Sequence, residues 1–211
     1  MVYNVRRMAA RRKRLRECVA FHGHLCMGQV LGVLLAERGM ELIGTEDPHE
    51  MIVVSENDRC IADALQIVTG TRLGRRSFKL RDMGKMAAVF LNTGTGKAFR
   101  VWLDEEPVPG GRDFHSLSAA DRKKALGEVL KADTRKLLGC EPVIIHFTEN
   151  ELPGRPKVRI DCDICGERVM DGKHVVKGKK NLCIACASGP YYQKAVKAQK
   201  GPKGQKGPKG A

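Results

Sequence analysis

Aromatic side chains and long apolar runs are what this chain has least of. Phenylalanine, tyrosine and tryptophan make up 5% of its 211 residues, and tryptophan occurs once. No apolar run approaches the ~20 residues that a membrane-spanning helix needs, so we do not expect a membrane protein. The scarcity of aromatics also disfavours the base-stacking surfaces of many nucleic-acid-binding domains.

Acidic residues are absent from both ends of the chain. Residues 1–16 carry seven basic side chains, and residues 194–211 carry six lysines. The net charge of +14 therefore belongs to the termini, because basic and acidic groups nearly balance between them. We interpret residues 194–211 as a disordered basic tail, since the chain holds too few Gly-X-Y triplets for a triple helix. A targeting segment is the less favoured interpretation of residues 1–16, because a motif-rich stretch follows closely.

Hydrophobic periodicity predicts an α+β core domain over residues 1–150, in which helices pack on a mainly antiparallel sheet. Helical spacing is found at 4–20, 27–40, 60–70, 118–130 and 133–139, with Ser118 expected to cap the fourth of these helices. Runs typical of strands are found at 51–56, 78–82, 85–92, 97–104 and 142–147. The turns RDMG and NTGTG separate three of these strands and predict an antiparallel meander.

The helix expected at 27–40 has two closely spaced glycines and an apolar face. Gly28 and Gly32 are four residues apart, so another backbone could approach the helix closely there. Val30, Val33, Leu34 and Leu35 supply an apolar face. We expect this helix to be central to the core.

Eight cysteines are present, and four of them form the pairs Cys162-x2-Cys165 and Cys183-x2-Cys186. Seventeen residues separate the pairs, a spacing typical of a four-thiolate zinc site, with iron as the alternative metal. We read no secretory leader, so metal binding in a reducing cytoplasm is favoured over disulfides. Residues 151–157 are interpreted as a linker, and 158–193 as a treble-clef or zinc-ribbon module that the metal folds. Four protein thiolates leave no open position, so this zinc is expected to be structural.

A second cysteine-containing motif, FHGHLCMG, directly precedes the helix expected at 27–40. His22, His24 and Cys26 are ligands that soft metals prefer, and Gly23 permits a turn between the histidines. A thiolate at a helix N-terminus is stabilised by free N–H groups, so we expect a lowered pKa for Cys26. Histidines that only satisfy loop backbone are the alternative.

The NDRC stretch repeats this arrangement, because Cys60 begins a predicted helix just after a strand. Asn57 and Asp58 would lie at the same edge of the sheet as Cys60. An ordinary buried thiol is the alternative for Cys60. We therefore expect His22 or His24, Cys26 and Cys60 to meet around a common cavity.

In combination these motifs resemble the E-subunit family of formylmethanofuran dehydrogenase. The resemblance covers about residues 15–193 and rests on FHGHLC, VVSENDRCIADALQIVTG, DMGKMAAVFLNTGTGKAFRV and the CxxC pairs followed by Tyr191 and Tyr192. The family's HGHxCPG motif falls on residues 22–28, with Met27 in place of proline. Its ENDRC falls on residues 56–60, and Asp63 and Lys85 match further positions. Thr71 stands where the family usually has a cysteine.

The resemblance implies an α+β core followed by a treble-clef zinc finger, assembled as a homodimer. It also implies association with the tungsten or molybdenum enzyme that reduces carbon dioxide onto methanofuran in methanogenesis. The chain shows no pterin-binding signature and no ferredoxin-type cysteine run. It would be at most an accessory component of that enzyme, and membership indicates the fold better than the reaction.

Three functions remain open from the sequence. In the first, His22, His24, Cys26 and Cys60 bind a second metal in the core, with Cys26, Cys60, Asp58 and Lys85 as candidate catalytic residues in C1 metabolism. In the second, the finger and the basic termini bind nucleic acid, which we consider less favoured. In the third, Cys26 and Cys60 act as a redox dithiol or a metal chaperone, which requires their Cα atoms to lie within ~7 Å.

Overall fold

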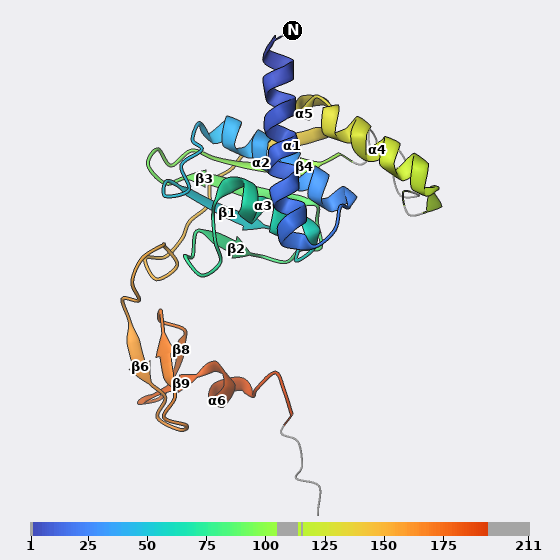
Figure 1. Cartoon of the computed structure of the whole chain (residues 1–211). Coiled ribbons are helices and arrows are strands. Elements are labelled where there is room, and N and C mark those ends of the chain that lie inside the picture. Colours follow the sequence, from blue (N-terminus) through green and yellow to red (C-terminus); the bar gives the residue numbers. More distant parts are fainter. Residues whose placement is uncertain (1, 105–113, 115, 194–211) are drawn as a thin grey trace, which may run out of the picture. The chain divides into compact units, whose positions relative to one another are not determined.

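The computed structural model describes residues 2–104, 114 and 116–193 (Figure 1). The chain divides into two compact units, Met1–Arg155 and Pro156–Ala211, and each is described by itself. The tail predicted at 194–211 lies outside the described residues. No helix in the described ranges is long and apolar enough to cross a membrane.

The first unit contains five helices and five strands among its described residues. The helices are α1 (Val2–His22), α2 (Met27–Ile43), α3 (Cys60–Thr69), α4 (Ala119–Lys131) and α5 (Thr134–Leu137). The strands are β1 (Met51–Ser55), β2 (Phe78–Leu80), β3 (Ala87–Asn92), β4 (Ala98–Leu103) and β5 (Leu138–Pro142). The predicted α+β class is confirmed.

The five strands form one mixed sheet in the order β2-β1-β3-β4-β5. β3 and β4 form the predicted antiparallel hairpin, but β2 and β3 do not pair, so the meander prediction is wrong for β2. β1 lies between them, parallel to β2 and antiparallel to β3, with Val53 opposite both Phe78 and Phe90. Every residue of β1 is buried, and such a strand is favoured at the centre of a sheet.

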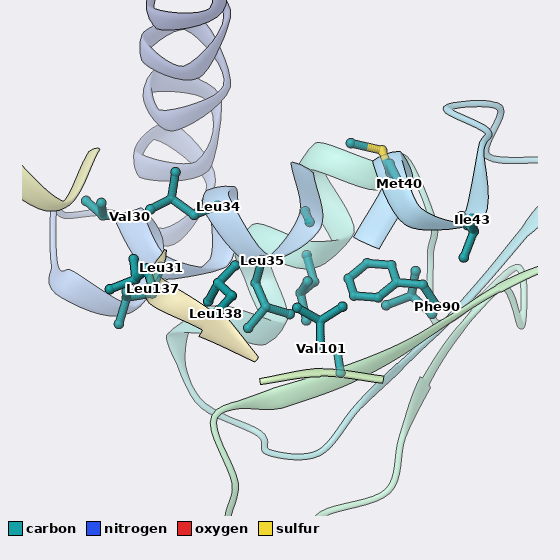
Figure 2. Close-up of a cluster of buried hydrophobic side chains, with 14 of the residues drawn as sticks. Val30, Leu31, Leu34, Leu35, Met40, Ile43, Phe90, Val101, Leu137 and Leu138 are labelled. Carbon is teal, nitrogen blue, oxygen red and sulfur yellow. The ribbon is translucent and has the colours of Figure 1, made fainter. Parts of the chain in front are cut away.

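α2 supplies most of the helical side of the core, as the sequence predicts. Val30, Val33, Leu34 and Leu35 are completely buried. Figure 2 shows Leu35 of α2 next to Val101 of the sheet, and Phe90 belongs to the same core cluster. A Cβ on Gly39 would lie 2.4 Å from the Phe90 ring, so a glycine there lets α2 rest directly on β3.

The strand predicted at 142–147 is misplaced, because β5 begins at Leu138 and ends at Pro142. Gly139 lies opposite Trp102, and a Cβ on it would come within 2.3 Å of the indole. This glycine therefore admits the large ring of β4 and does not end the preceding helix, which stops at Leu137. Ile144, expected in the strand, is 85% exposed.

The remaining helix predictions for this unit agree with the structure. The hydroxyl of Ser118 caps α4 by accepting a hydrogen bond from the Asp121 N–H at 3.1 Å. α3 ends before Gly70, whose φ of 70° is left-handed. α1 places Arg11, only 2% exposed, against the end of α4, where its Nη1 donates to the carbonyls of Leu130 and Ala132.

The second unit consists of two short hairpins and one helical turn. β6 (Arg159–Asp161) pairs with β7 (Arg168–Met170), and β8 (His174–Lys177) pairs with β9 (Lys180–Cys183). α6 (Ile184–Ser188) follows directly. The β8–β9 hairpin is formed by the stretch HVVKGKKNLC, which ends at Cys183.

Candidate metal centres

The four cysteines of the second unit converge on one point. The sulfur atoms of Cys162, Cys165, Cys183 and Cys186 all lie within 4.8 Å of one another. The first pair belongs to a tight turn in which the Gly166 N–H donates to the Cys162 carbonyl at 2.9 Å, with φ of 74° at the glycine. Cys183 is the N-cap of α6, and Cys186 lies in its first turn. A tight turn supplies two of the four cysteines, and the start of a helix supplies the other two, which is an arrangement that a zinc finger uses.

Backbone N–H groups prepare the first of these thiols for metal binding. Hydrogen bonds from the N–H groups of Cys165, Cys183 and Ile164 lower the pKa of Cys162 to about 6. The neighbouring Cys183 thiol and burial raise the pKa of Cys186 to about 12. Packing four thiolates together without a cation is unfavourable, and a zinc ion removes that repulsion. The donor set therefore fits zinc.

A second cluster lies in the first unit, where His22, Cys26 and Cys60 each bring one ligand atom within 4.8 Å of the other two. His22 is the last residue of α1, Cys26 is the N-cap of α2, and Cys60 is the first residue of α3. Three helix ends therefore meet at one place, and all three side chains are partly buried.

Two glycines of α2 allow α3 to approach closely enough for this meeting. A Cβ on Gly28 would lie 2.7 Å from the Cys60 Cβ, and one on Gly32 would lie 2.5 Å from the Ala64 Cβ. The predicted close approach at these positions is confirmed, and the partner is α3. Without the glycines, Cys60 would be held away from Cys26.

Gln29 connects the two cysteine-bearing elements. It is completely buried, and its Nε2 donates to the Cys60 carbonyl at 2.7 Å. Its backbone N–H faces the Cys26 thiol. No motif in the sequence identifies this role, because it depends on how α2 packs against α3.

Asp63 orients the histidine of the cluster. Because a carboxylate only accepts, the 2.8 Å contact is a hydrogen bond from His22 Nδ1 to Asp63 Oδ2. The tautomer then carries a lone pair on Nε2, which is buried and has no partner in the described part of the chain. Metal-binding histidines show this pattern, with a carboxylate behind the ring and the other nitrogen directed to the metal. The spacing of Asp63 from Cys60, three residues on one helix face, was the available sequence signal.

The thiol of Cys26 does not have the lowered pKa that the sequence predicts. Burial raises its pKa, and the adjacent Cys60 thiol adds to the rise. The backbone N–H groups of Gln29 and Gly28 act in the opposite direction without outweighing burial. One helix N-terminus cannot compensate for desolvation of a thiolate, whereas a bound cation would.

Three other predicted site residues lie outside this cluster. His24 is exposed, although its ring packs on that of His22 with centroids 4.6 Å apart. The side chain of Asp58 is 63% exposed and forms an ion pair with the neighbouring Arg59. Lys85 is also exposed, and it is its backbone carbonyl that accepts a hydrogen bond from Asn57. Asp58 and Lys85 lie in turns next to β1 and β3, whereas His24 lies in the turn between α1 and α2.

The two departures from the family motif leave this cluster intact. Met27 is partly buried and packs against the core. Thr71 is completely buried, and its hydroxyl bonds that of Thr69 at 2.7 Å. It follows α3, whose ten residues span ~15 Å, so it lies far from Cys60 at the other end. The missing cysteine at 71 therefore removes no ligand from this cluster.

Fold and sites together define a two-module metal-binding protein, with a mixed α/β core and a four-cysteine zinc finger. The sequence profile of FmdE, described as molybdenum formylmethanofuran dehydrogenase operon, matches residues 21–139. The chain belongs to this family. Residues 156–192 match the prokaryotic dksA/traR C4-type zinc finger.

One curated relative and one solved structure are also similar. A probable S-adenosyl-L-methionine-binding protein of Archaeoglobus fulgidus is 28% identical over an alignment of 196 residues, and the match covers 82% of this chain. The chain spans about half of that relative, 51% of its length. The crystal structure of a tungsten formylmethanofuran dehydrogenase FmdE-like protein from Syntrophus aciditrophicus superposes with a TM-score of 0.63. It is 21% identical and covers 87% of this chain and 95% of its own, which shows a shared fold.

Proposed function

We propose that His22, Cys26 and Cys60 bind a soft divalent metal, such as zinc, with a fourth position open to water or a ligand. The observation that carries this is that the Nε2 of His22 is buried without a hydrogen-bond partner among the described residues, while Asp63 holds Nδ1. A ring nitrogen of His22 lies within 4.8 Å of both thiols. Orphaned buried polar atoms are rare, and a metal would satisfy this one. Sites with three protein ligands and an open position are typical of reactive zinc.

The residues around the proposed site have distinct tasks. Asp63 fixes the tautomer of His22, and Gln29 fixes the Cys60 backbone relative to α2. A bound metal of this kind supplies Lewis-acid activation of whatever occupies its open position. The partial burial of all three ligands limits access of water, which strengthens electrostatic interactions at the site.

We also propose that the protein acts in C1 metabolism, as a cytoplasmic accessory partner of a molybdenum or tungsten formylmethanofuran dehydrogenase. Support comes from the family description and from the name of the structurally similar protein, each of which refers to that enzyme. A homodimer is part of this proposal. Purification of the tagged chain from its native cells tests it, because co-purification of a pterin-containing enzyme is expected. Recovery of the chain without that enzyme would contradict this role.

Metal content tests the core site directly. The full chain is expected to bind two zinc ions, one in each unit, and the Cys26→Ala/Cys60→Ala variant only one. Cys18→Ala/Cys140→Ala is the matched control, because neither of those cysteines belongs to a metal-binding cluster among the described residues. A stoichiometry near one in the unsubstituted protein would contradict the core site.

A second candidate function is a thiol redox or metal-transfer role for Cys26 and Cys60. The close approach of their two sulfurs favours it, since disulfide formation needs that proximity. Oxidised glutathione would be reduced to two glutathione molecules as the Cys26–Cys60 disulfide forms. Peptide mapping of the oxidised protein is expected to recover the linked peptides. If the only linked cysteines come from the finger, this candidate is wrong.

A further inference from the structure

The outward face of α1 carries an apolar groove that nothing in the described chain covers. The α1 groove has a volume of about 460 Å³. It is lined by Arg12, Leu15, Arg16, Val19, Ala20 and Leu25. Leu15 and Val19 provide its apolar floor, and the two arginines border it.

One large hydrophobic side chain that lines the groove is exposed. Leu25 is 48% exposed. Leaving such a side chain in water forgoes the free energy gained by burial, and apolar side chains exposed together mark interaction sites. Leu25 directly precedes Cys26, so this surface adjoins the loop that carries a ligand of the core cluster.

The charges of α1 fall into two groups. Arg7 and Arg11 pair with Glu37 of α2, and Arg14 pairs with Glu46. Arg12, Lys13 and Arg16 are exposed, and no ion pair involves them within the described residues. Glu17 is the one acidic residue of the helix. The border of the α1 groove is therefore an uncompensated cationic surface.

The spacing of the groove residues suits a helix. Arg12, Leu15, Arg16, Val19 and Ala20 follow the i, i+3, i+4, i+7, i+8 pattern of one helix face. The small Ala20 and the partly buried Val19 leave space for side chains of a second helix packed along α1. An apolar hollow between helical ridges is the geometry of helix-in-groove recognition.

We propose that the α1 groove binds an amphipathic helix of another protein, with an apolar stripe and flanking Asp and Glu residues. Charge complementarity selects this occupant. The α1 helix of a second copy would bring cations against cations. A nucleic acid or an anionic bilayer would satisfy the charges, but neither a phosphate backbone nor a flat lipid surface fills a narrow apolar hollow.

The test uses the full-length protein and a fluorescein-labelled helical peptide of about 20 residues, long enough to be helical. The probe has Leu at i, i+3, i+4 and i+7 and Glu at the flanking positions. Saturable binding is expected by anisotropy, with Kd below about 100 µM. Replacing Glu by Lys, or Leu by Ser, in the peptide is expected to weaken binding at least ~10-fold.

Variants of α1 localise the binding. Arg12→Glu/Arg16→Glu is expected to raise Kd at least ~10-fold, and Ala20→Glu, which places a carboxylate in the groove, by a similar factor. Lys13→Glu is the matched control, because it reverses an exposed charge of the same helix outside the groove. Its effect should stay within ~3-fold, as expected for an exposed charge. Circular dichroism confirms that each variant is folded.

Several outcomes overturn the proposal. Equal losses in Lys13→Glu and Arg12→Glu/Arg16→Glu would show diffuse attraction with no groove involved. Tighter binding to duplex DNA or to phosphatidylglycerol vesicles, at the same salt concentration, would assign the surface to a different partner. A dimer that dissociates on Ala20→Glu would make a second copy the occupant. Absence of saturable peptide binding would also contradict it.

Discussion

At the scale of single residues, the hydrogen bond between His22 and Asp63 decides how well the core cluster can bind a metal. Asp63→Ala removes the acceptor of Nδ1–H, so the ring can rotate and change tautomer. Zinc affinity of the core site is expected to fall ~10–100-fold, as in other proteins that lose the carboxylate behind a metal-binding histidine. Competition with a fluorescent chelator measures this, while the affinity of the finger should remain unchanged.

Asp58→Ala is the matched control for this change. It removes a carboxylate from the turn just before α3, but its exposed side chain pairs with Arg59, whereas Asp63 is the hydrogen-bond partner of His22. If Asp58→Ala and Asp63→Ala lose zinc affinity equally, the loss comes from removing a negative charge near the site and not from losing the orientation of His22. Folding should be retained in both, because the Asp63 side chain is itself 35% exposed.

Cys18 predicts a dependence of stability on pH. It is fully buried between α1 and the other helices, and burial together with the charge of Glu17 raises its pKa from 9.0 to about 11. A raised folded-state pKa means that its contribution is complete below pH 9 and is lost as pH rises to about 11. Up to ~2 kcal/mol of unfolding free energy should disappear in that window. Urea unfolding measures it, and Cys18→Ala should show a shallower decline than the unsubstituted protein.

At the scale of elements, contact between α2 and α3 positions the cluster. Gly28→Ala would place a Cβ 2.7 Å from the Cys60 Cβ, so α3 must shift and carry Cys60 with it. We expect a loss of ~1–3 kcal/mol in unfolding free energy and weaker zinc binding at the core site. Urea unfolding and zinc competition measure the two effects.

Gly127→Ala in α4 is the control for that substitution. Nothing lies within 4 Å of the Cβ it would add, so improved helix propensity should stabilise the protein by up to about 1 kcal/mol. A Gly28→Ala variant that is as stable as Gly127→Ala, with unchanged zinc affinity, would show that the close approach of α3 is unimportant.

Local sequence patterns predicted elements better than their pairing. The spacing of Val30, Leu34 and Leu35 was enough to predict α2, and Gly70 was enough to predict the end of α3. The position of β1 between β2 and β3 could not be predicted, because a short turn such as RDMG does not show whether the next strand pairs with the preceding one or with a more distant one. The start of β5 was also missed, since the role of Gly139 depends on Trp102 in another strand.

In the candidate site too, some residues could be predicted from local sequence patterns and others could not. Cys26 and Cys60 could be predicted as site residues because each lies in a recognisable pattern at the start of a helix. The choice of His22 over His24 could not be predicted, because it depends on which of the two rings Asp63 of α3 contacts. Gln29 lies one position beyond the recognised motif and acts through a carbonyl on another helix. Long-range polar contacts of this kind leave no periodic signal in a single sequence.

At the scale of the whole molecule, the two units depend on different forces. The first unit has a continuous apolar core built on α2 and the sheet. In the second unit, the only apolar or thiol side chains that are buried among its described residues are those of Cys162 and Leu182. So small an apolar core cannot offset the entropy of ordering two hairpins. The metal must supply most of the stability of the second unit.

Removing zinc from the full chain is therefore expected to unfold the second unit and leave the first one folded. Hydrogen exchange after treatment with a chelator should show loss of protection in β8 and β9, while β1 and β3 remain protected. Cys165→Ala should reproduce the loss without chelator, because three thiolates hold zinc less tightly than four. Cys26→Ala is the control and should leave exchange in β8 and β9 unchanged. If β8 and β9 remain protected after zinc removal, this unit folds by its own contacts and does not need zinc in order to fold.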